Sequence, residues 1–144
     1  MKLALAGAIA LAFAGAAYAE PVKAKTANGV VVGDLAAGIA SYKGIPFAAP
    51  PVGDLRWKSP QPVANWAGER AATEFGASCM QNSRLGAEAK VSEDCLYLNV
   101  FAPAGARNAP VMVWIHGGSN LNGSGSIYNG PAFARDGVVT VTVN

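Results

Sequence analysis

The sequence is poor in the side chains that metal and acid–base sites use most. It has one histidine, two cysteines and 14% charged residues among 144. No cluster of His and Cys with metal-ligand spacing and no phosphate-binding glycine loop can be found. The formal net charge is only +2, which is too small for the basic footprint of a nucleic-acid-binding domain. The composition therefore argues against a nucleic-acid partner and gives no reason to expect a metal.

A long hydrophobic run occurs only at the N-terminus. After Lys2, the segment Leu3 to Ala19 is uncharged and mostly Ala, Leu, Ile and Phe. It is shorter than the roughly 20 apolar residues that cross a bilayer, and it ends in Ala-Tyr-Ala, the small-x-small form of a signal-peptidase site. We therefore expect residues 1–19 to be a signal peptide cleaved before Glu20. The protein would then be secreted or periplasmic, without a membrane span.

The two cysteines are Cys79 and Cys95. An even number of cysteines in an exported chain favours a disulfide over two buried thiols. In the chain-entropy model, a disulfide closing a loop of this length stabilises the fold by roughly 3 kcal/mol.

Residues 20–63 predict a small β-structure followed by an extended segment. We expect residues 20–28 to be a loose lead-in, because they are polar. Val30–Val32 and Gly38–Lys43 each predict a short strand, and the two can pair as a hairpin. The proline density of residues 44–63 excludes a helix and predicts extended chain. Its apolar side chains suggest that it packs on a surface, namely Ile45, Phe47, Leu55 and Trp57.

The remaining residues predict the beginning of an α/β sheet. Residues 64–92 are mixed and polar, which indicates a loop with at most a helical turn. The later elements expected are a strand at 96–101, a strand at 111–115 buried on both faces, a glycine-rich loop at 117–130, a short helix at 131–135 and a strand at 138–143. The last two strands, joined by a loop and a helix that begins with Pro131, predict a parallel crossover.

The chain stops at Asn144, directly after the last predicted strand. A strand left at the edge of a sheet invites aggregation. We therefore expect residues 138–143 to need a further neighbouring strand, and the sequence to be a truncated piece of a larger domain.

The segment with the clearest chemical meaning follows the strand at 111–115. It reads His116-Gly117-Gly118-Ser119. A buried strand that runs into His-Gly-Gly resembles the oxyanion-hole loop of α/β-hydrolase esterases and lipases. Oxyanion donors must lie about 2.7–3.1 Å from the developing charge, and backbone comes this close only where side chains are absent.

Two further segments make the resemblance specific. Residues 93–99 read E-D-C-L-Y-L-N, which is a signature of type-B carboxylesterases. Residues 42–57 resemble the G-I-P-[FY]-A-x-P-P-x-G-x-x-R segment of the same family. All three segments stand in the family's order, and the likeness covers residues 29–144. We therefore identify the chain as a member of the type-B carboxylesterase family.

The resemblance implies a fold and a domain organisation. Residues 20–144 would be the N-terminal, incomplete part of an α/β-hydrolase domain. In that fold a mostly parallel central sheet is preceded by a small N-terminal β-hairpin. The sequence would end before the nucleophile elbow, because no G-x-S-x-G occurs in it.

The resemblance also implies roles for individual residues. Gly118 and Ser119 would donate the oxyanion-hole N–H groups. Ser119 stands where the family has glycine, so a side chain lies near the acyl site. His116 and Gly117 would be structural parts of the loop. Two further pairs are implied, a Cys79–Cys95 disulfide and an Arg56–Glu93 ion pair.

Other candidates for the catalytic groups are weaker. His116 is the only histidine, but a base must reach both a nucleophile and an orienting acid, and the family's base lies far downstream. Ser124 and Ser126 lack the G-x-S-x-G context of a nucleophile. The nucleophile, the acid and the base are therefore not expected in this chain.

The implied activity is hydrolysis of small-molecule esters by serine acyl transfer, without a cofactor, with this chain inactive alone. A non-catalytic binding or adhesion module of the same family is the alternative, and a short inactive product is a third possibility. Substrate preference and oligomeric state do not follow from the sequence.

Overall fold

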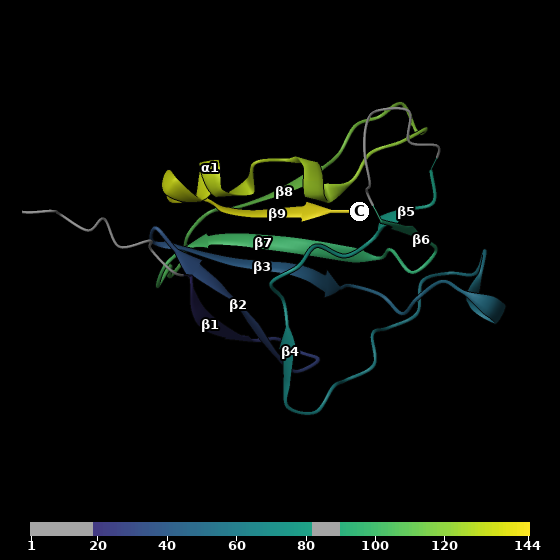
Figure 1. Cartoon of the computed structure of the whole chain (residues 1–144), viewed down its shortest axis with the longest axis horizontal. Coiled ribbons are helices and arrows are strands. Elements are labelled where there is room, and N and C mark those ends of the chain that lie inside the picture. The colour runs from purple at the N-terminus through teal and green to yellow at the C-terminus, as the bar shows by residue number, and fades with distance from the viewer. Residues whose placement is uncertain (1–18, 82–89) are drawn as a thin grey trace, which may run out of the picture.

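The computed structural model describes residues 19–81 and 90–144 (Figure 1). The predicted signal peptide lies outside the described residues, except for Ala19. The elements are β1 (Glu20–Lys25), β2 (Val30–Ala36), β3 (Ile39–Pro46), η1 (Gly53–Leu55), β4 (Glu69–Ala71), β5 (Ser78–Cys79), β6 (Val91–Ser92), β7 (Tyr97–Pro103), β8 (Val111–Ile115), η2 (Gly125–Ile127), α1 (Gly130–Arg135) and β9 (Val139–Val143). No helix among the described residues is long and apolar enough to span a membrane.

One mixed sheet organises the described chain. Its main strand order is β1-β2-β3-β7-β9-β8, with β4 paired to β2, and β5 and β6 form a separate small parallel pair. The pairs β1–β2, β2–β3, β3–β7 and β7–β9 are antiparallel. Parallel pairing in the main sheet joins β2 to β4 and β8 to β9. The antiparallel N-terminal strands thus lead into a parallel β8–β9 unit.

The predicted hairpin is present and larger than expected. β2 and β3 pair antiparallel around Ala37 and Gly38, both of which have positive φ. The lead-in at residues 20–28 was wrongly expected to be loose, because Glu20–Lys25 forms β1 along the outer edge of β2. Its alternate residues Val22 and Ala24 pack on the core around Val31, so a tertiary contact, not local composition, makes this polar segment a strand.

The proline-rich segment is extended for most of its length, as predicted, and contains one short 3-10 turn, η1. The expectation that its apolar side chains all pack on a surface is wrong for Trp57 and holds only in part for Phe47, which is 42% exposed. Trp57 is 92% exposed, and the guanidinium of Arg56 lies over its ring, 5.8 Å from the centroid. Residues 64–92 contain the short strands β4, β5 and β6 where only loop was expected.

Two small cores form on opposite faces of the sheet. Val31, Ala40, Tyr42 and Ala72 make the first, and burial raises the pKa of the Tyr42 hydroxyl. Ile39, Phe101 and Ala134 make the second, under α1. Ile39 and Ala40 are consecutive in β3 and therefore point to opposite faces.

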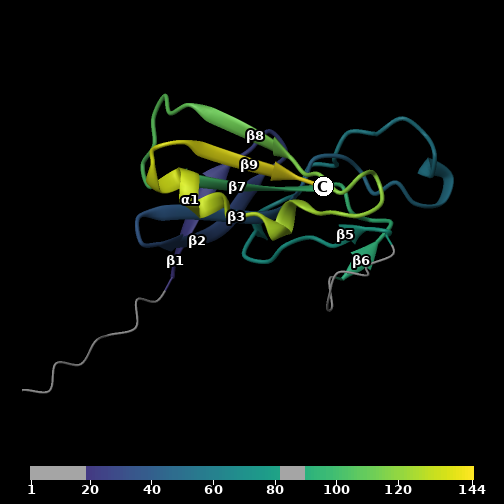
Figure 2. The ribbon, with the colours of Figure 1, turned by 90° about the horizontal axis from the view of Figure 1, so that it is seen from above.

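The predicted parallel crossover from β8 through α1 to β9 is present. Helix α1 begins at Gly130 with a proline in its first turn and packs on β7 and β9, as Figure 2 shows. β9 then runs between β7 and β8, where Thr140 and Thr142 are 1% and 0% exposed. Thr142 Oγ1 accepts a hydrogen bond from the buried Asn99 amide at 3.0 Å.

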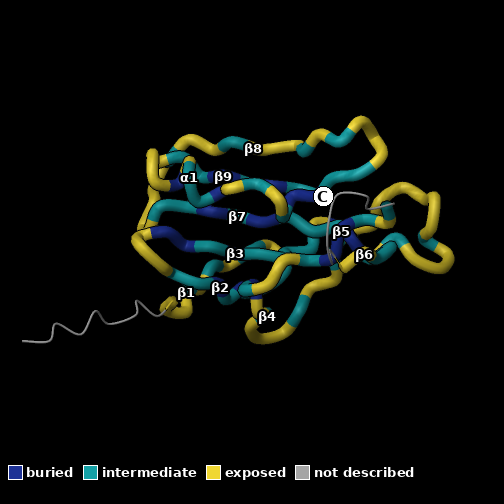
Figure 3. The backbone as a smooth tube through the Cα atoms, turned by 45° about the horizontal axis from the view of Figure 1, so that its top comes forward, coloured by how far each residue is buried: buried dark blue, intermediate teal, exposed yellow. Residues whose placement is uncertain are grey.

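The expected edge of the sheet was assigned to the wrong strand. Residues 138–143 were expected to lie exposed, but β9 is internal and β8 forms the edge. Val111, Val113 and Ile115 of β8 are 63%, 59% and 78% exposed, and Figure 3 shows this strand as the exposed margin. The prediction that residues 111–115 are buried on both faces is therefore wrong for the described chain, because no described element covers the β8 face that carries these side chains.

Candidate active-site loop

The His-Gly-Gly segment begins where β8 ends, as predicted. Gly118 adopts φ +134°, and its carbonyl oxygen accepts hydrogen bonds from Leu121 N at 2.9 Å and Asn122 N at 3.2 Å. These bonds fold residues 118–122 into a tight turn directly after the strand. A Cβ built on Gly118 would overlap the carbonyl oxygen of Asn122. Glycine is therefore required here both for its backbone conformation and for the close approach of the chain.

The next two residues continue the turn in the left-handed region. Ser119 has φ +56° and Asn120 has φ +58°, although Ser is uncommon in this conformation. Both side chains are exposed. Within the described residues, the backbone N–H groups of Gly118 and Ser119 donate no hydrogen bond, whereas Gly117 N lies 3.4 Å from the Tyr128 hydroxyl as a donor. The N–H of Asn120 likewise donates none, so three consecutive backbone donors of this turn have no partner among the described residues.

His116 is held within the loop itself. Its Nδ1 lies 2.9 Å from the Gly117 carbonyl oxygen. Because a carbonyl oxygen only accepts, Nδ1 carries the proton in this contact. Gly123 packs so closely that a Cβ there would overlap the His116 ring. No carboxylate in the described ranges lies within ion-pair distance of His116. Its structural role stays a prediction.

Residues 123–126 form the return limb of the loop. Two carboxamide side chains attach this limb to the residues around Cys79 and Cys95, here called the disulfide segment. Gln81 Oε1 accepts from Gly123 N at 2.8 Å and its Nε2 donates to Gly123 O at 2.9 Å. Asn144 Oδ1 accepts from Gly125 N at 2.9 Å, and its Nδ2 donates to the carbonyls of Ala77 and Cys95. Sequence reasoning missed both residues, because a single Gln or Asn in a polar segment carries no local signal of its partner.

The serines of the return limb serve the local backbone. Ser124 is 4% exposed and caps η2, with its Oγ accepting from Ser126 N at 3.1 Å. The two hydroxyl oxygens lie 2.8 Å apart. Neither has a histidine partner among the described residues. That neither is a nucleophile stays a prediction.

Both pairs implied by the resemblance are present. Cys79 and Cys95 form a disulfide with a Cα–Cα distance of 4.9 Å. Arg56 Nη2 lies 2.7 Å from Glu93 Oε1, with side chains 57% and 38% exposed. The disulfide places Cys79 beside the segment that leads into β7, and therefore close to the end of β9.

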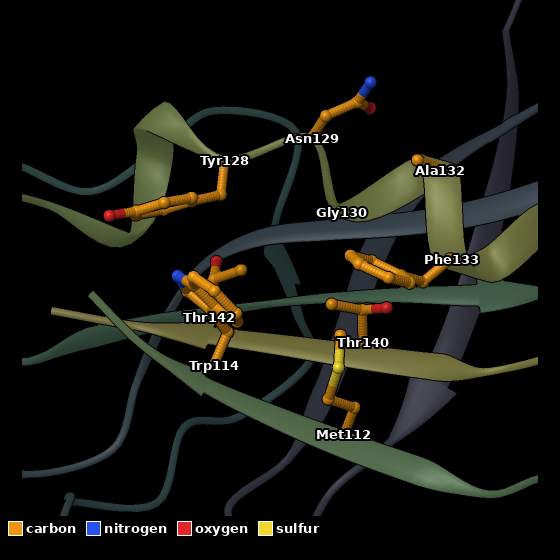
Figure 4. Close-up of a pocket in the computed structure, with 9 residues that line it drawn as sticks. All are labelled: Met112, Trp114, Tyr128, Asn129, Gly130, Ala132, Phe133, Thr140 and Thr142. Atoms are coloured by element: carbon orange, nitrogen blue, oxygen red, sulfur yellow. The ribbon is translucent and has the colours of Figure 1, made fainter. Parts of the chain in front are cut away.

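An apolar cavity of about 170 Å³ lies beside the loop, between β8, β9 and α1 (Figure 4). Trp114 and Tyr128 meet across it with ring centroids 5.2 Å apart. The buried hydroxyl Thr140 Oγ1 has no hydrogen-bond partner in the described part of the chain. Among the described residues that line the cavity, Tyr128 is the only titratable one, so the lining offers mainly shape and apolar surface.

Comparison with known proteins shows the family. The carboxylesterase family matches residues 20–144. The chain is 44% identical over 154 residues to a fumonisin B1 esterase of Sphingopyxis macrogoltabida, with 96% of this chain and 28% of that protein covered. It is 45% identical over 128 residues to the para-nitrobenzyl esterase of Bacillus subtilis, covering 83% and 26% respectively.

Solved structures agree with this result. A PNB esterase structure superposes with a TM-score of 0.81 at 44% identity and covers 85% of this chain and 27% of that one. The juvenile hormone esterase of Manduca sexta superposes with a TM-score of 0.78 at 31% identity, covering 87% and 26%. The chain thus spans about a quarter of the length of these relatives. The described fold is the N-terminal part of an α/β-hydrolase, as predicted, and the chain belongs to the carboxylesterase family.

Proposed function

We propose that this chain supplies the oxyanion-binding loop of an exported carboxylic-ester hydrolase. The proposal rests on the consecutive backbone N–H groups of Gly118 and Ser119, which lie in a turn directly after β8 and have no hydrogen-bond partner among residues 19–81 and 90–144. Backbone donors held by the fold need no reorganisation when charge develops on a substrate oxygen. Membership in the carboxylesterase family supports small-molecule esters as the substrate class.

The proposed mechanism is serine acyl transfer. A serine attacks the ester carbonyl carbon, a histidine takes the serine proton and passes it to the leaving alcohol, and a carboxylate orients the histidine. The N–H groups of Gly118 and Ser119 donate to the carbonyl oxygen as it becomes an oxyanion. The residue after the nucleophile donates a further N–H. We place the nucleophile, the acid and the base outside these 144 residues, because the sequence has no G-x-S-x-G and His116 is engaged within the loop.

This division of roles makes a direct prediction about the chain alone. An oxyanion hole without an activated nucleophile has nothing with which to attack the ester. The isolated 144-residue chain should not hydrolyse p-nitrophenyl esters above background. Turnover that a serine-directed inhibitor abolishes would show that a nucleophile lies within these residues.

Gly118→Val in the full-length protein tests the loop. Valine cannot adopt φ +134° without strain, and its Cβ meets the Asn122 carbonyl. The turn must shift and the donors with it, so kcat for p-nitrophenyl acetate should fall at least about tenfold, since one lost donor typically lowers kcat about 10²–10³-fold.

The matched control is Gly68→Val. Gly68 also has positive φ, +71°, but has open space around its missing Cβ and precedes β4. The Gly68→Val variant should have a lower free energy of unfolding, because of the same backbone strain, and an unchanged kcat. Near-normal kcat in Gly118→Val would exclude the loop as the oxyanion hole. A folded full-length protein that hydrolyses no ester would instead favour the binding or adhesion alternative.

A further inference from the structure

Gln81 makes an unusually complete set of hydrogen bonds to the candidate loop. Its carboxamide pairs with both backbone groups of Gly123, accepting from N at 2.8 Å and donating to O at 2.9 Å. The same Nε2 donates to the carbonyl of Cys79 at 3.0 Å. The carboxamide therefore pairs with the N–H and the carbonyl of Gly123 as a backbone peptide group would, although the two residues are 42 positions apart in the sequence.

The orientation of this carboxamide is determined by its partners. Two carbonyl oxygens face the Nε2 side and one N–H faces the Oε1 side. A flipped amide would place its oxygen against two acceptors and its nitrogen against a donor. Only glutamine has both the reach and the donor–acceptor pair for these three contacts. Glutamate would keep the contact to Gly123 N and oppose the two carbonyls.

Gly123 is in direct contact with the residues that lead into the donors. A Cβ on Gly123 would overlap both the His116 ring and the Gly117 carbonyl oxygen. The preceding residue, Asn122, donates its N–H to Gly118 O at 3.2 Å. A displacement of Gly123 therefore moves both limbs of the turn that carries the N–H groups of Gly118 and Ser119.

We propose that Gln81 is a positioning residue for the oxyanion-binding loop, holding the turn at 118–122 in register with the disulfide segment. This inference rests on the proposed function of that loop. Gln81 follows Cys79 by two positions, and Cys79 is bonded to Cys95. The disulfide thus anchors the residue that in turn fixes Gly123. The three hydrogen bonds of the Gln81 side chain all go to backbone atoms, so the residue acts through the backbone of the loop.

The test compares Gln81→Met, which keeps the length of the side chain and removes all three hydrogen bonds, with Gln81→Glu in the full-length protein. Displaced donors act only in the transition state, so kcat should fall about tenfold while KM stays within about twofold. Gln81→Glu should show a similar loss, because repulsion from the two carbonyls moves the same limb. Gln61→Met is the matched control and should leave kcat unchanged. Gln61 is exposed, and its side chain bonds only the Ser59 carbonyl among the described residues.

Hydrogen exchange provides a readout that does not depend on catalysis. In Gln81→Met the hydrogen-bonded backbone amides of Leu121, Asn122 and Gly123 should exchange at least about tenfold faster than in the unsubstituted protein, while those of β7 stay protected. Reduction of the disulfide should produce the same local change. If the unsubstituted protein turns over no ester, the proposed function fails, and exchange alone decides the positioning role. Unchanged exchange in the loop, or unchanged kcat beside accelerated exchange, would overturn the inference.

Discussion

Ser119 occupies a backbone conformation that glycine favours. Its φ is +56°, and its hydroxyl makes no hydrogen bond among the described contacts that would offset the strain. A left-handed conformation costs a non-glycine residue about 1–2 kcal/mol, whereas glycine loses about 0.5–1 kcal/mol through the entropy of the unfolded chain. The strain is the larger effect, so serine at this position carries a net cost.

Ser119→Gly should therefore raise the free energy of unfolding of the full-length protein by about 0.5 kcal/mol. It should also keep kcat, because the backbone N–H is retained. Urea unfolding and ester turnover measure the two effects. Asn120→Gly is the comparison, since Asn120 has a similar φ of +58° but asparagine tolerates this region better, and its gain should be smaller. Destabilisation by Ser119→Gly would mean that the serine side chain makes a contact that matters.

At the level of single residues, chemistry was easier to predict than packing. Gly118 was predicted as a loop residue, and its φ and close approach to Asn122 give the reason. Cys79 and Cys95 were predicted as a pair from export and from the family motif. Trp57 was wrongly expected to pack, because nothing in a proline-rich segment states which side faces solvent. Gln81 had no sequence signal at all.

The Arg56–Glu93 pair links two elements, the turn after η1 and the segment before β7. Both side chains are more than a third exposed, so solvent screens the attraction. Glu93→Gln should lower the free energy of unfolding by less than about 1 kcal/mol. Glu69→Gln, which breaks the similarly exposed Lys23–Glu69 pair, should behave alike. Measurement by urea unfolding in low and in 1 M salt (roughly a 3 Å Debye length) checks this, and a loss of several kcal/mol would show that the pair is shielded from water.

The long apolar strands were predictable, and so were the β2–β3 and β8–β9 pairings, but the full order of strands in the sheet was not. The runs at 96–101, 111–115 and 138–143 all form strands. Their order in the sheet, with β9 between β7 and β8, depends on the direction of the crossover through α1. Both β8 and β9 are apolar runs, so composition alone does not tell which of them is internal and which lies at the edge of the described sheet.

On the scale of the whole molecule, β8 is the edge strand of the described sheet and the part of that sheet most prone to association. Its side chains at 111, 113 and 115 are exposed and apolar, and an exposed apolar edge strand promotes association. Val113→Lys should therefore raise the soluble concentration of the 144-residue chain several-fold, about the effect expected of an edge charge. Ser59→Lys, which adds the same charge to an exposed loop, should not. Static light scattering at increasing concentration compares the two variants. An equal rise in soluble concentration for both would indicate that net charge is the cause.

Export is proposed from the N-terminal segment. The family match and β1 both begin at residue 20, the position after the predicted cleavage. The exported protein should start at Glu20, which N-terminal sequencing or intact mass measures. A mature protein that still begins at Met1 would refute cleavage.

The sequence by itself determined the family, the strands β2, β3, β7, β8 and β9, the disulfide and the position of the glycine loop. These features depend on local backbone preferences or on short sequence motifs, neither of which requires knowledge of contacts between distant residues. The tertiary structure decided which strand lies at the edge, which apolar side chains meet solvent and which distant side chains hold the loop. Those outcomes depend on contacts between residues far apart in the chain, such as Gln81 with Gly123 and Asn144 with Cys95. Only the folded arrangement brings such groups within hydrogen-bond distance.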